Sequence, residues 1–374
     1  MSPIPARLGV SLGLGALAAA LGYLLLWPVP IEPVAWDAPA FAGYTGPHAR
    51  NDRLARLRLV EVGPHVGPEH IVFGPDGLLY TGMRSGAVLR GQPDGTGFER
   101  FVDTKGRPLG LDFDAMGRLV IADAIRGLLA VQPAGTVVVL TDTVGLEPIR
   151  YADAVKVASD GRMLFTDAST RFSPAEYGTF DAALLDILEH SCTGRVLEYD
   201  PANAATRIVA SGLCFPNGVA LSADERALIV AETGTYRILK LPRDADLLDV
   251  GRALQSRDPR VQVLLDNLPG FPDNVTRGAD GRYWVGLTKP RSDDIDGMSR
   301  KPWLRALTLR LPKALWPVPP AYGHVIAFDE DGRVLADLQD AAGALPETSG
   351  ATEHQGQLYV QSLHADAFGM LPAF

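Results

Sequence analysis

Residues 153–168 read DAVKVASDGRMLFTDA, and this stretch decides the fold class. Alternating apolar residues lead into a turn at Asp160-Gly161 and a second apolar run follows, which predicts a hairpin of two antiparallel strands. The arrangement returns five more times, with its turn at Asp76-Gly77, Met116-Gly117, Asp224-Glu225, Asp280-Gly281 and Gln355-Gly356. One hairpin repeated along more than 300 residues indicates a repeat architecture.

Further apolar pairs follow several hairpins, as in GAVLRGQPDG at residues 86–95 and GRVLEYDPA at residues 194–202. Four short strands per unit, recurring at roughly 40 to 75 residues, are typical of propeller blades. The sequence therefore predicts an all-β protein, a six-bladed β-propeller over residues 54–374. The strand at residues 54–63 is expected to complete the last blade and close the ring. A β-sandwich has too few strands to explain the repeat.

The composition fits a globular protein with no nucleic-acid partner. The 374 residues are 47% hydrophobic and 21% charged, and the net charge is −9, whereas phosphate binding requires clustered Lys and Arg. Cys192 and Cys214 do not form a CxxC motif, so their spacing predicts no zinc or redox site. A disulfide and two free thiols both remain open.

The N-terminus differs from the rest. Residues 8–27 read LGVSLGLGALAAALGYLLLW, an uncharged run about long enough to cross a bilayer. Arg7 precedes it and Glu32 follows, so the distribution of charge predicts a cytoplasmic segment at residues 1–7 and an anchor at residues 8–27. A linker at residues 28–53 would then lead to an extracytoplasmic propeller, periplasmic in a bacterium. A cleaved signal peptide is the alternative.

Two insertions have helical spacing, at residues 177–190 and residues 302–316. Both fall between predicted strands, so they are expected to project from one face of the ring. The second insertion is basic and apolar, which leaves three interpretations open: a lid over the site, a surface that lies on a membrane, and a plain packing helix.

One repeat position carries the candidate site. The residues seven positions before each turn are, in blade order, Glu69, Leu109, Asp153, Asn217, Asp273 and Thr348. Four of them offer a hard oxygen ligand. Equivalent positions at the start of the innermost strands of a propeller converge on the central axis, so these four side chains are predicted to meet there.

Three carboxylates gathered on one axis repel one another, and a divalent cation resolves that repulsion. Ca²⁺ takes six to eight oxygen ligands, whereas Zn²⁺ draws on His or Cys, which none of the six positions supplies. The predicted cofactor is therefore one Ca²⁺ ion, with other divalent ions as options. Asn274, beside Asp273, offers a further oxygen.

Several segments resemble a known family. They are GPEHIVFGPDG (67–77), YADAVKVASDGRMLFTDASTRF (151–172), FPNGVALSADERALIVAETGTYRI (215–238), LPGFPDNV (268–275) and the insertion from residue 302. They are similar to strictosidine synthase-like proteins and the adipocyte plasma membrane-associated protein, and more distantly to paraoxonases and SMP-30/gluconolactonases. The resemblance runs from about residue 61 to the C-terminus and includes the N-terminal apolar segment. It implies a six-bladed propeller with Ca²⁺ held by Glu69, Asp153, Asn217 and Asp273.

The chain departs from those relatives at four positions. The family often has Asn where this chain has Asp153. Paraoxonases hold a second calcium with Asp residues that match His70 and Ala154, so the resemblance implies a single ion here. They also have a proposed histidine base where this chain has Leu109, so their proton-transfer arrangement does not carry over. The catalytic glutamate of strictosidine synthase matches no residue, and alkaloid condensation is not expected.

The sequence thus predicts a calcium-dependent esterase or lactonase that acts on a small-molecule ester or lactone. The metal would polarise the carbonyl, water would attack, and Asp273 or Asp153 would take the proton of that water. His70, next to Glu69, and His354, in the last blade, are additional candidates.

The alternative function is a non-catalytic, calcium-stabilised binding or scaffold propeller at the membrane surface. The two hypotheses differ in what surrounds the ion. A pocket that faces the ion, lined by residues such as Phe215, Phe271 and Trp284, favours the hydrolase. A pocket filled by the 302–316 insertion favours the scaffold.

Overall fold

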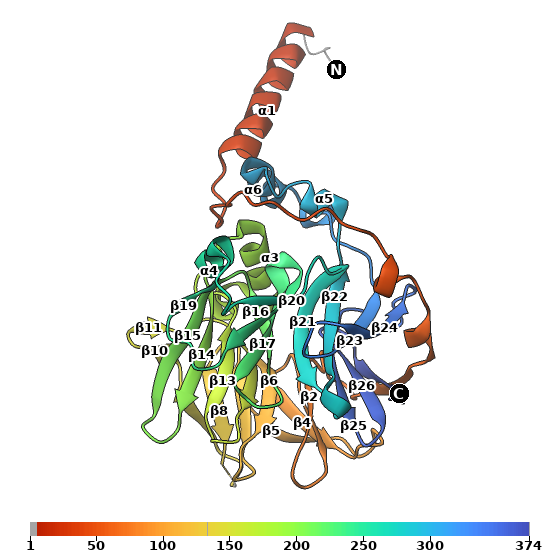
Figure 1. The fold of residues 1–374 in the computed structure, drawn as a ribbon. Coiled ribbons are helices and arrows are strands. Elements are labelled where there is room, and N and C mark those ends of the chain that lie inside the picture. Colours follow the sequence, from red (N-terminus) through yellow and green to blue (C-terminus); the bar gives the residue numbers. More distant parts are fainter. Residues whose placement is uncertain (1–5, 133, 374) are drawn as a thin grey trace.

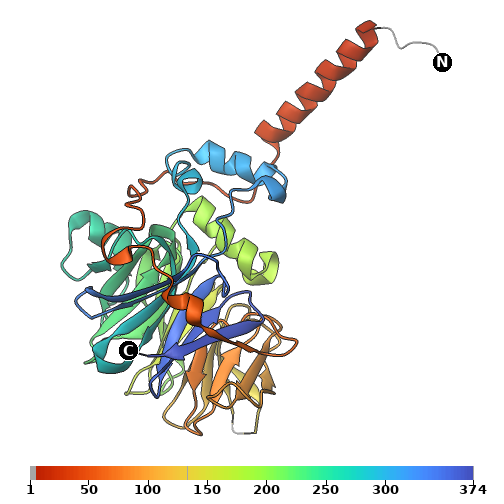
Figure 2. The ribbon, with the colours of Figure 1, turned by 90° about the vertical axis from the view of Figure 1, so that its right-hand side faces the viewer.

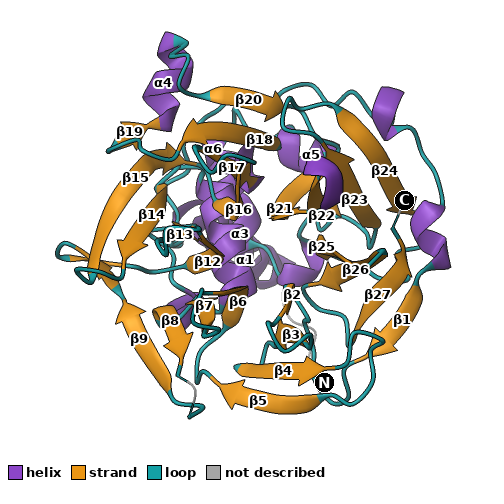
Figure 3. Cartoon of the chain, turned by 60° about the horizontal axis from the view of Figure 1, so that its bottom comes forward, coloured by secondary structure: helices purple, strands orange, loops and turns teal. Residues whose placement is uncertain are grey.

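The computed structural model describes residues 6–132 and 134–373, and side chains from Leu14 onward. Six antiparallel sheets stand in a ring, with the first strand of each sheet nearest the axis (Figure 3). This arrangement confirms the predicted six-bladed propeller with four strands per blade. Adjacent blades pack face to face through apolar side chains, as between blades 3 and 4, where Leu164, Val196 and Val230 are fully buried.

The first three blades run outward from the axis. They comprise β2 (Ile71–Phe73), β3 (Leu79–Gly82), β4 (Ala87–Gly91) and β5 (Glu99–Asp103); β6 (Pro108–Phe113), β7 (Leu119–Asp123), β8 (Gly127–Val131) and β9 (Val137–Thr141); and β12 (Ala152–Val157), β13 (Met163–Asp167), β14 (Gly194–Asp200) and β15 (Ala205–Leu213), with β19 (Leu248–Asp249) added in parallel. A small hairpin between blades 2 and 3 consists of β10 (Thr143–Val144) and β11 (Glu147–Pro148).

The other three blades follow the same order. They comprise β16 (Pro216–Leu221), β17 (Ala227–Glu232), β18 (Arg237–Pro242) and β20 (Gln262–Leu265); β21 (Gly270–Arg277), β22 (Tyr283–Pro290), β23 (Gly323–Phe328) and β24 (Val334–Asp340); and β25 (Thr348–His354), β26 (Gln357–Ser362), β27 (Ala367–Pro372) and β1 (Arg58–Glu61).

The predicted closure of the ring is confirmed. Strand β1, from the beginning of the propeller, pairs antiparallel with β27 at its end, with Leu59 opposite Gly369. The hairpin turns also form where the repeat places them. Gly77, Gly117 and Gly161 have φ of 78°, 73° and 86°, the left-handed conformation that these tight turns require and glycine adopts without strain.

The helices gather on one face of the ring (Figures 1 and 2). They include α2 (Pro174–Tyr177), α3 (Thr179–Glu189), α5 (Asp293–Asp296), α6 (Pro302–Arg310) and the turn η5 (Lys313–Leu315), while α4 (Val250–Ser256) lies at an outer edge. Both predicted helical insertions are therefore confirmed. Arg305 of α6 points inward, only 3% exposed, and donates to the carbonyl oxygens of Leu188 at 2.8 Å and Ser299 at 3.1 Å. Arg305 thereby joins the two insertions, which together are here called the roof.

Helix α1 (Ala6–Leu26) projects away from the ring (Figures 1 and 2). Within the described part of the chain, no helix combines the length and apolarity needed to cross a membrane. This finding overturns the predicted anchor at residues 8–27 and the single-pass topology with an extracytoplasmic propeller.

The predicted linker passes between α6 and the propeller and then runs down the outside of blade 5 (Figure 1). Its last part, residues 46–53, is here called the strap. The strap contains η1 (Gly46–His48), ends at the first residue of η2 (Arg53–Arg56) and packs on β24. The two cysteines, left open by the sequence, form a disulfide that joins Cys192, after α3, to Cys214, before β16.

Candidate metal centre

A β-bulge at the start of the inner strand carries each of three predicted ligands. The register shifts between Ala152 and Val155, between Pro216 and Val219, and between Pro272 and Val275. The bulged pairs contain Asp153, Asn217 and Asp273. An extra residue in one strand turns its side chain out of the regular alternation. The bulge is therefore the local feature that directs these side chains toward the axis.

Two glycines let the inner strands approach one another beside the ligands. A Cβ on Gly218, next to Asn217, would lie 2.1 Å from the backbone nitrogen of Val275. A Cβ on Gly110 would lie 2.6 Å from the Cα of Ala154. No side chain fits at these distances, so glycine at both positions is a condition for bringing the ligand positions together.

The four predicted ligands are all buried and border one cavity. The exposed fractions are 1% for Glu69, 2% for Asp153, 5% for Asn217 and 4% for Asp273. Three of their oxygen atoms, Glu69 Oε2, Asn217 Oδ1 and Asp273 Oδ1, are buried without a hydrogen-bond partner in the described structure. Buried polar atoms are nearly always paired in folded proteins, so three unpaired acceptors from three blades indicate a missing ligand.

The remaining contacts of these side chains hold them in place. The Asn217 amide donates to Asp153 Oδ2 at 3.3 Å. Asn274 donates to Glu69 Oε1 at 2.7 Å and to the Glu69 carbonyl oxygen at 3.2 Å, while Ser349 Oγ donates to that carbonyl at 2.6 Å. Asn274, predicted as a possible further ligand, thus orients Glu69 through its amide nitrogen.

The electrostatics of this axial cluster (Glu69, Asp153, Asn217 and Asp273) disfavour ionisation. Burial raises the pKa of Glu69 to about 7, with Arg107 and Asn274 acting in the opposite direction. Burial, followed by the charge of Glu69, raises the pKa of Asp153 and of Asp273 well above the usual range. A bound cation reverses this effect because it stabilises the ionised carboxylates.

The axial cluster forms the floor of a cavity of about 370 Å³. Apolar side chains make up most of the walls, including Phe215 and Phe271 as predicted. Trp284 was predicted beside them, but it is fully buried in the packing between blades 5 and 6. Leu184 of α3 and Met298, before α6, border the cavity from above. The insertions therefore cover the cavity and leave space between themselves and the axial cluster.

Arg107 is the residue that the repeat count missed. It lies two positions before Leu109, is 4% exposed and borders the cavity. Its Nε and Nη1 are buried and have no hydrogen-bond partner in the part of the chain that the structure describes. The sequence signal that could have found it is its position. Arg107 directly precedes the inner strand of blade 2, a blade whose repeat position, Leu109, offers no oxygen ligand. The cavity is therefore lined by the positively charged guanidinium of Arg107 as well as by carboxyl groups.

The other two repeat positions have structural roles. Leu109 is buried among the apolar residues beneath the roof. The Thr348 hydroxyl donates to the His324 carbonyl at 2.8 Å and accepts from the His324 backbone nitrogen at 2.9 Å. It thereby joins blade 6 to blade 5.

The two additional histidines lie apart from the cluster. His70 Nδ1 accepts from the backbone nitrogen of Leu111 at 3.0 Å, which joins the inner strands of blades 1 and 2, and burial lowers its pKa to about 4. His354 stacks on Phe73, with ring centroids 3.6 Å apart. It ends β25 six residues after Thr348, about 20 Å along a strand that rises about 3.3 Å per residue.

The donor set fits a hard divalent cation. Carboxylate and amide oxygens are the ligands that Ca²⁺ prefers, and the axial cluster supplies no His or Cys. The three carboxylates are not among the groups of three described His, Cys, Asp or Glu side chains whose ligand atoms all lie within 4.8 Å of one another. A cation on the axis would therefore draw them closer together.

Comparison with known proteins identifies the family. Residues 46–91 match the N-terminal model of the strictosidine synthase-like family, and residues 153–242 match that of strictosidine synthase. A strictosidine synthase-like protein of Arabidopsis thaliana is 33% identical, with 83% of this chain and 82% of the relative covered. The adipocyte plasma membrane-associated protein of Salmo salar is 31% identical, with 92% and 84% covered.

Solved structures share the fold at low sequence identity. A gluconolactonase from Xanthomonas campestris has a TM-score of 0.57 and 20% identity, with 93% of this chain and 99% of that chain covered. A calcium-binding regucalcin from Agrobacterium tumefaciens has a TM-score of 0.56 and 13% identity, with 84% and 92% covered. The identity to the curated relatives over more than four fifths of the chain shows that this chain belongs to the strictosidine synthase-like family.

Proposed function

We propose that this protein is a calcium-dependent hydrolase of lactones or aryl esters, with the axial cluster as its catalytic centre. The observation that carries the proposal is the set of unpaired buried oxygens of Glu69, Asn217 and Asp273 at the floor of the cavity. Leaving such groups buried and unpaired costs about 2–7 kcal/mol each, which a cation would offset. The fold shared with a gluconolactonase and a calcium-binding regucalcin supports the proposal.

Glu69, Asp153, Asn217 and Asp273 would hold the ion through their oxygen atoms. When bound, Ca²⁺ supplies positive charge that polarises a substrate carbonyl and stabilises the oxyanion. The protein's own side chains transfer the proton and position the substrate. Asp273 or Asp153 accepts the proton of the attacking water as general base, and the apolar walls hold the body of the substrate and limit bulk water.

Arg107 has a separate role in this proposal. Its unpaired Nε and Nη1 donate hydrogen bonds to an oxygen of the bound substrate, either the carbonyl or the ring oxygen of a lactone. The guanidinium would thereby orient the ester group over the axial carboxylates.

The test is hydrolysis of a panel of aryl esters and γ- and δ-lactones by the full chain, first with Ca²⁺ and then with EDTA. Turnover that EDTA abolishes and Ca²⁺ restores is the expected result. Turnover that persists in EDTA would contradict the proposed role of the metal.

The second candidate function is a calcium-stabilised binding propeller, and the same assay distinguishes it. No turnover on any member of the panel, together with a melting temperature that Ca²⁺ raises, would make the ion structural. The covered cavity, which the roof leaves unfilled, favours the hydrolase.

A further inference from the structure

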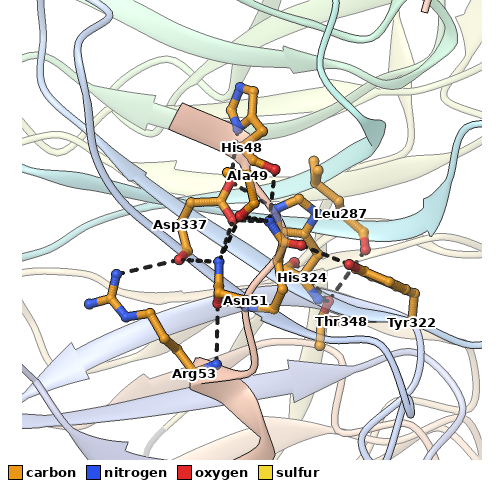
Figure 4. Close-up of polar contacts among 10 residues, drawn as sticks. His48, Ala49, Asn51, Arg53, Leu287, Tyr322, His324, Asp337 and Thr348 are labelled. Carbon is orange, nitrogen blue, oxygen red and sulfur yellow. Dashed lines mark hydrogen bonds and ion pairs between the residues drawn. The ribbon is translucent and has the colours of Figure 1, made fainter. Parts of the chain in front are cut away.

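A second cluster of ligand-type side chains lies about the strap, away from the cavity. His48 comes from the strap, His324 from β23 and Asp337 from β24 (Figure 4). His48 Nδ1 lies 2.8 Å and His324 Nε2 lies 3.0 Å from the same oxygen, Asp337 Oδ2. All three ligand atoms lie within 4.8 Å of one another. Two segments nearly 300 residues apart thus meet at a single carboxylate oxygen.

The cluster is enclosed and has one accessible edge. The side chains of His324 and Asp337 are 2% and 4% exposed, whereas that of His48 is 17% exposed. An ion could therefore enter from the side of the strap.

Outer contacts fix the carboxylate and the strap (Figure 4). Gln339 Nε2 donates to Asp337 Oδ1, which leaves Oδ2 facing the two imidazoles. Asn51 of the strap donates to the Asp337 carbonyl oxygen at 3.2 Å and accepts from the Gln339 backbone nitrogen at 3.0 Å. A second set of hydrogen bonds that orients the ligands is a regular feature of metal sites in proteins.

We propose that His48, His324 and Asp337 bind one Zn²⁺ ion that fastens the strap to blade 5. Two imidazole nitrogens and one carboxylate oxygen match the preference of Zn²⁺, and three protein ligands leave the fourth tetrahedral position for water. Each neutral imidazole presents a lone pair once its proton moves to the other ring nitrogen, so the ion takes the place of two N–H···O hydrogen bonds. Ligand bonds of about 2.0–2.2 Å require only small movements of these side chains.

The site has a structural consequence because the strap precedes β1. Strand β1 closes the ring by pairing with β27, so an ion that fastens the strap to β23 and β24 also restrains the closing strand. An ion bound only by the folded chain stabilises the fold by mass action. This role is independent of ester hydrolysis on the axis.

The experiment is a titration of the full chain with Zn²⁺ by calorimetry, in excess Ca²⁺ so that the oxygen-lined axial cluster is occupied. One Zn²⁺ per chain is expected. His48→Ala should weaken binding at least about a hundredfold, because loss of a ligand exceeds the roughly 10- to 100-fold effect of an outer partner. His65→Ala, which changes a partly buried histidine outside the cluster, is the matched control and should leave the affinity unchanged.

Wild-type protein that binds no Zn²⁺, or equal Zn²⁺ affinity in His48→Ala and wild type, would overturn the proposal. Circular dichroism should show that His48→Ala is folded, because the His48 side chain is only partly buried and its loss leaves the propeller core intact. Histidine ring signals in NMR provide a second measurement. Those of His48 and His324 should shift with Zn²⁺ and not with Ca²⁺, and unshifted signals would assign any bound Zn²⁺ to another site.

Discussion

The axial cluster and the strap cluster both bury carboxylates, but they satisfy them differently. On the axis, one oxygen each of Glu69, Asn217 and Asp273 has no hydrogen-bond partner among the described residues. At the strap, the Asp337 carboxylate accepts hydrogen bonds from two imidazoles and from the side-chain amides of Gln339 and Asn51. The axial cluster therefore requires a partner from outside the chain, such as a cation. The strap cluster is already hydrogen-bonded, and an ion would stabilise it further. We infer that the axial cluster is the catalytic centre and that the strap cluster stabilises the closure of the ring.

The largest difference between the two clusters should appear on replacing Asp273. In Asp273→Asn, loss of the general base and of one charged ligand should lower kcat/KM for a lactone by about 10²- to 10⁴-fold and weaken Ca²⁺ binding. Steady-state kinetics and calcium titration measure the two effects.

Asp280→Asn is the matched control, because Asp280 is an exposed carboxylate seven residues along the same blade, at the hairpin turn. It should retain wild-type turnover. Full activity in Asp273→Asn would exclude Asp273 as the general base and leave Asp153 as the candidate for that role.

The repeat allowed the six blades, the closing strand and the four axial positions to be predicted, because period-two alternation and turn residues are local properties of the sequence. Arg107 was missed because it lies outside the repeat position, and its burial depends on the roof. The strap cluster was missed because His48 and Asp337 are 289 residues apart and no repeat connects them. The predicted anchor at residues 8–27 was wrong, since none of the helices in the described residues is both long and apolar enough to cross a membrane.

The pH dependence of stability should have opposite signs at the two clusters. Burial raises the pKa of Glu69 to about 7 from an ordinary 4.5, so the folded chain binds more protons than the unfolded chain in this interval. In EDTA, the contribution of Glu69 to the free energy of unfolding should fall by a few kcal/mol as the pH rises from about 5 to 8. Urea unfolding of the wild type and Glu69→Gln at both pH values measures it.

Burial alone would raise the pKa of Asp337. Hydrogen bonds from His324 and His48 outweigh this effect and hold the pKa below its ordinary value of 3.8. Its contribution is therefore present above that value and lost as the pH falls through and below it. Asp337→Asn should remove this acid dependence. Equal slopes in Glu69→Gln and wild type between about pH 5 and 8 would show that Glu69 is not the source of the alkaline loss.

Arg107→Met tests the fixed cation beside the axial cluster. Turnover should fall about 10²-fold, as for loss of one donor to a developing oxyanion, while Ca²⁺ affinity should rise several-fold because the guanidinium repels the ion. Arg90→Met is the control, since Arg90 pairs with Glu99 on the outside of blade 1. A loss of Ca²⁺ affinity in Arg107→Met would mean that the guanidinium organises the carboxylates rather than opposing the ion.

The smallest effect is expected at the strap, from Asn51→Ala. The Asn51 side chain accepts from the Gln339 backbone nitrogen at 3.0 Å, and its removal leaves that buried donor unpaired, at a cost of about 1–3 kcal/mol in the free energy of unfolding. Turnover should not change, because Asn51 is remote from the cavity. Asn203→Ala, which loses only an exposed turn contact to Ala205, should stay within about 0.5 kcal/mol of wild type. Since the strap leads into the closing strand, unchanged stability in Asn51→Ala would mean that β1 closes the ring without help from the strap.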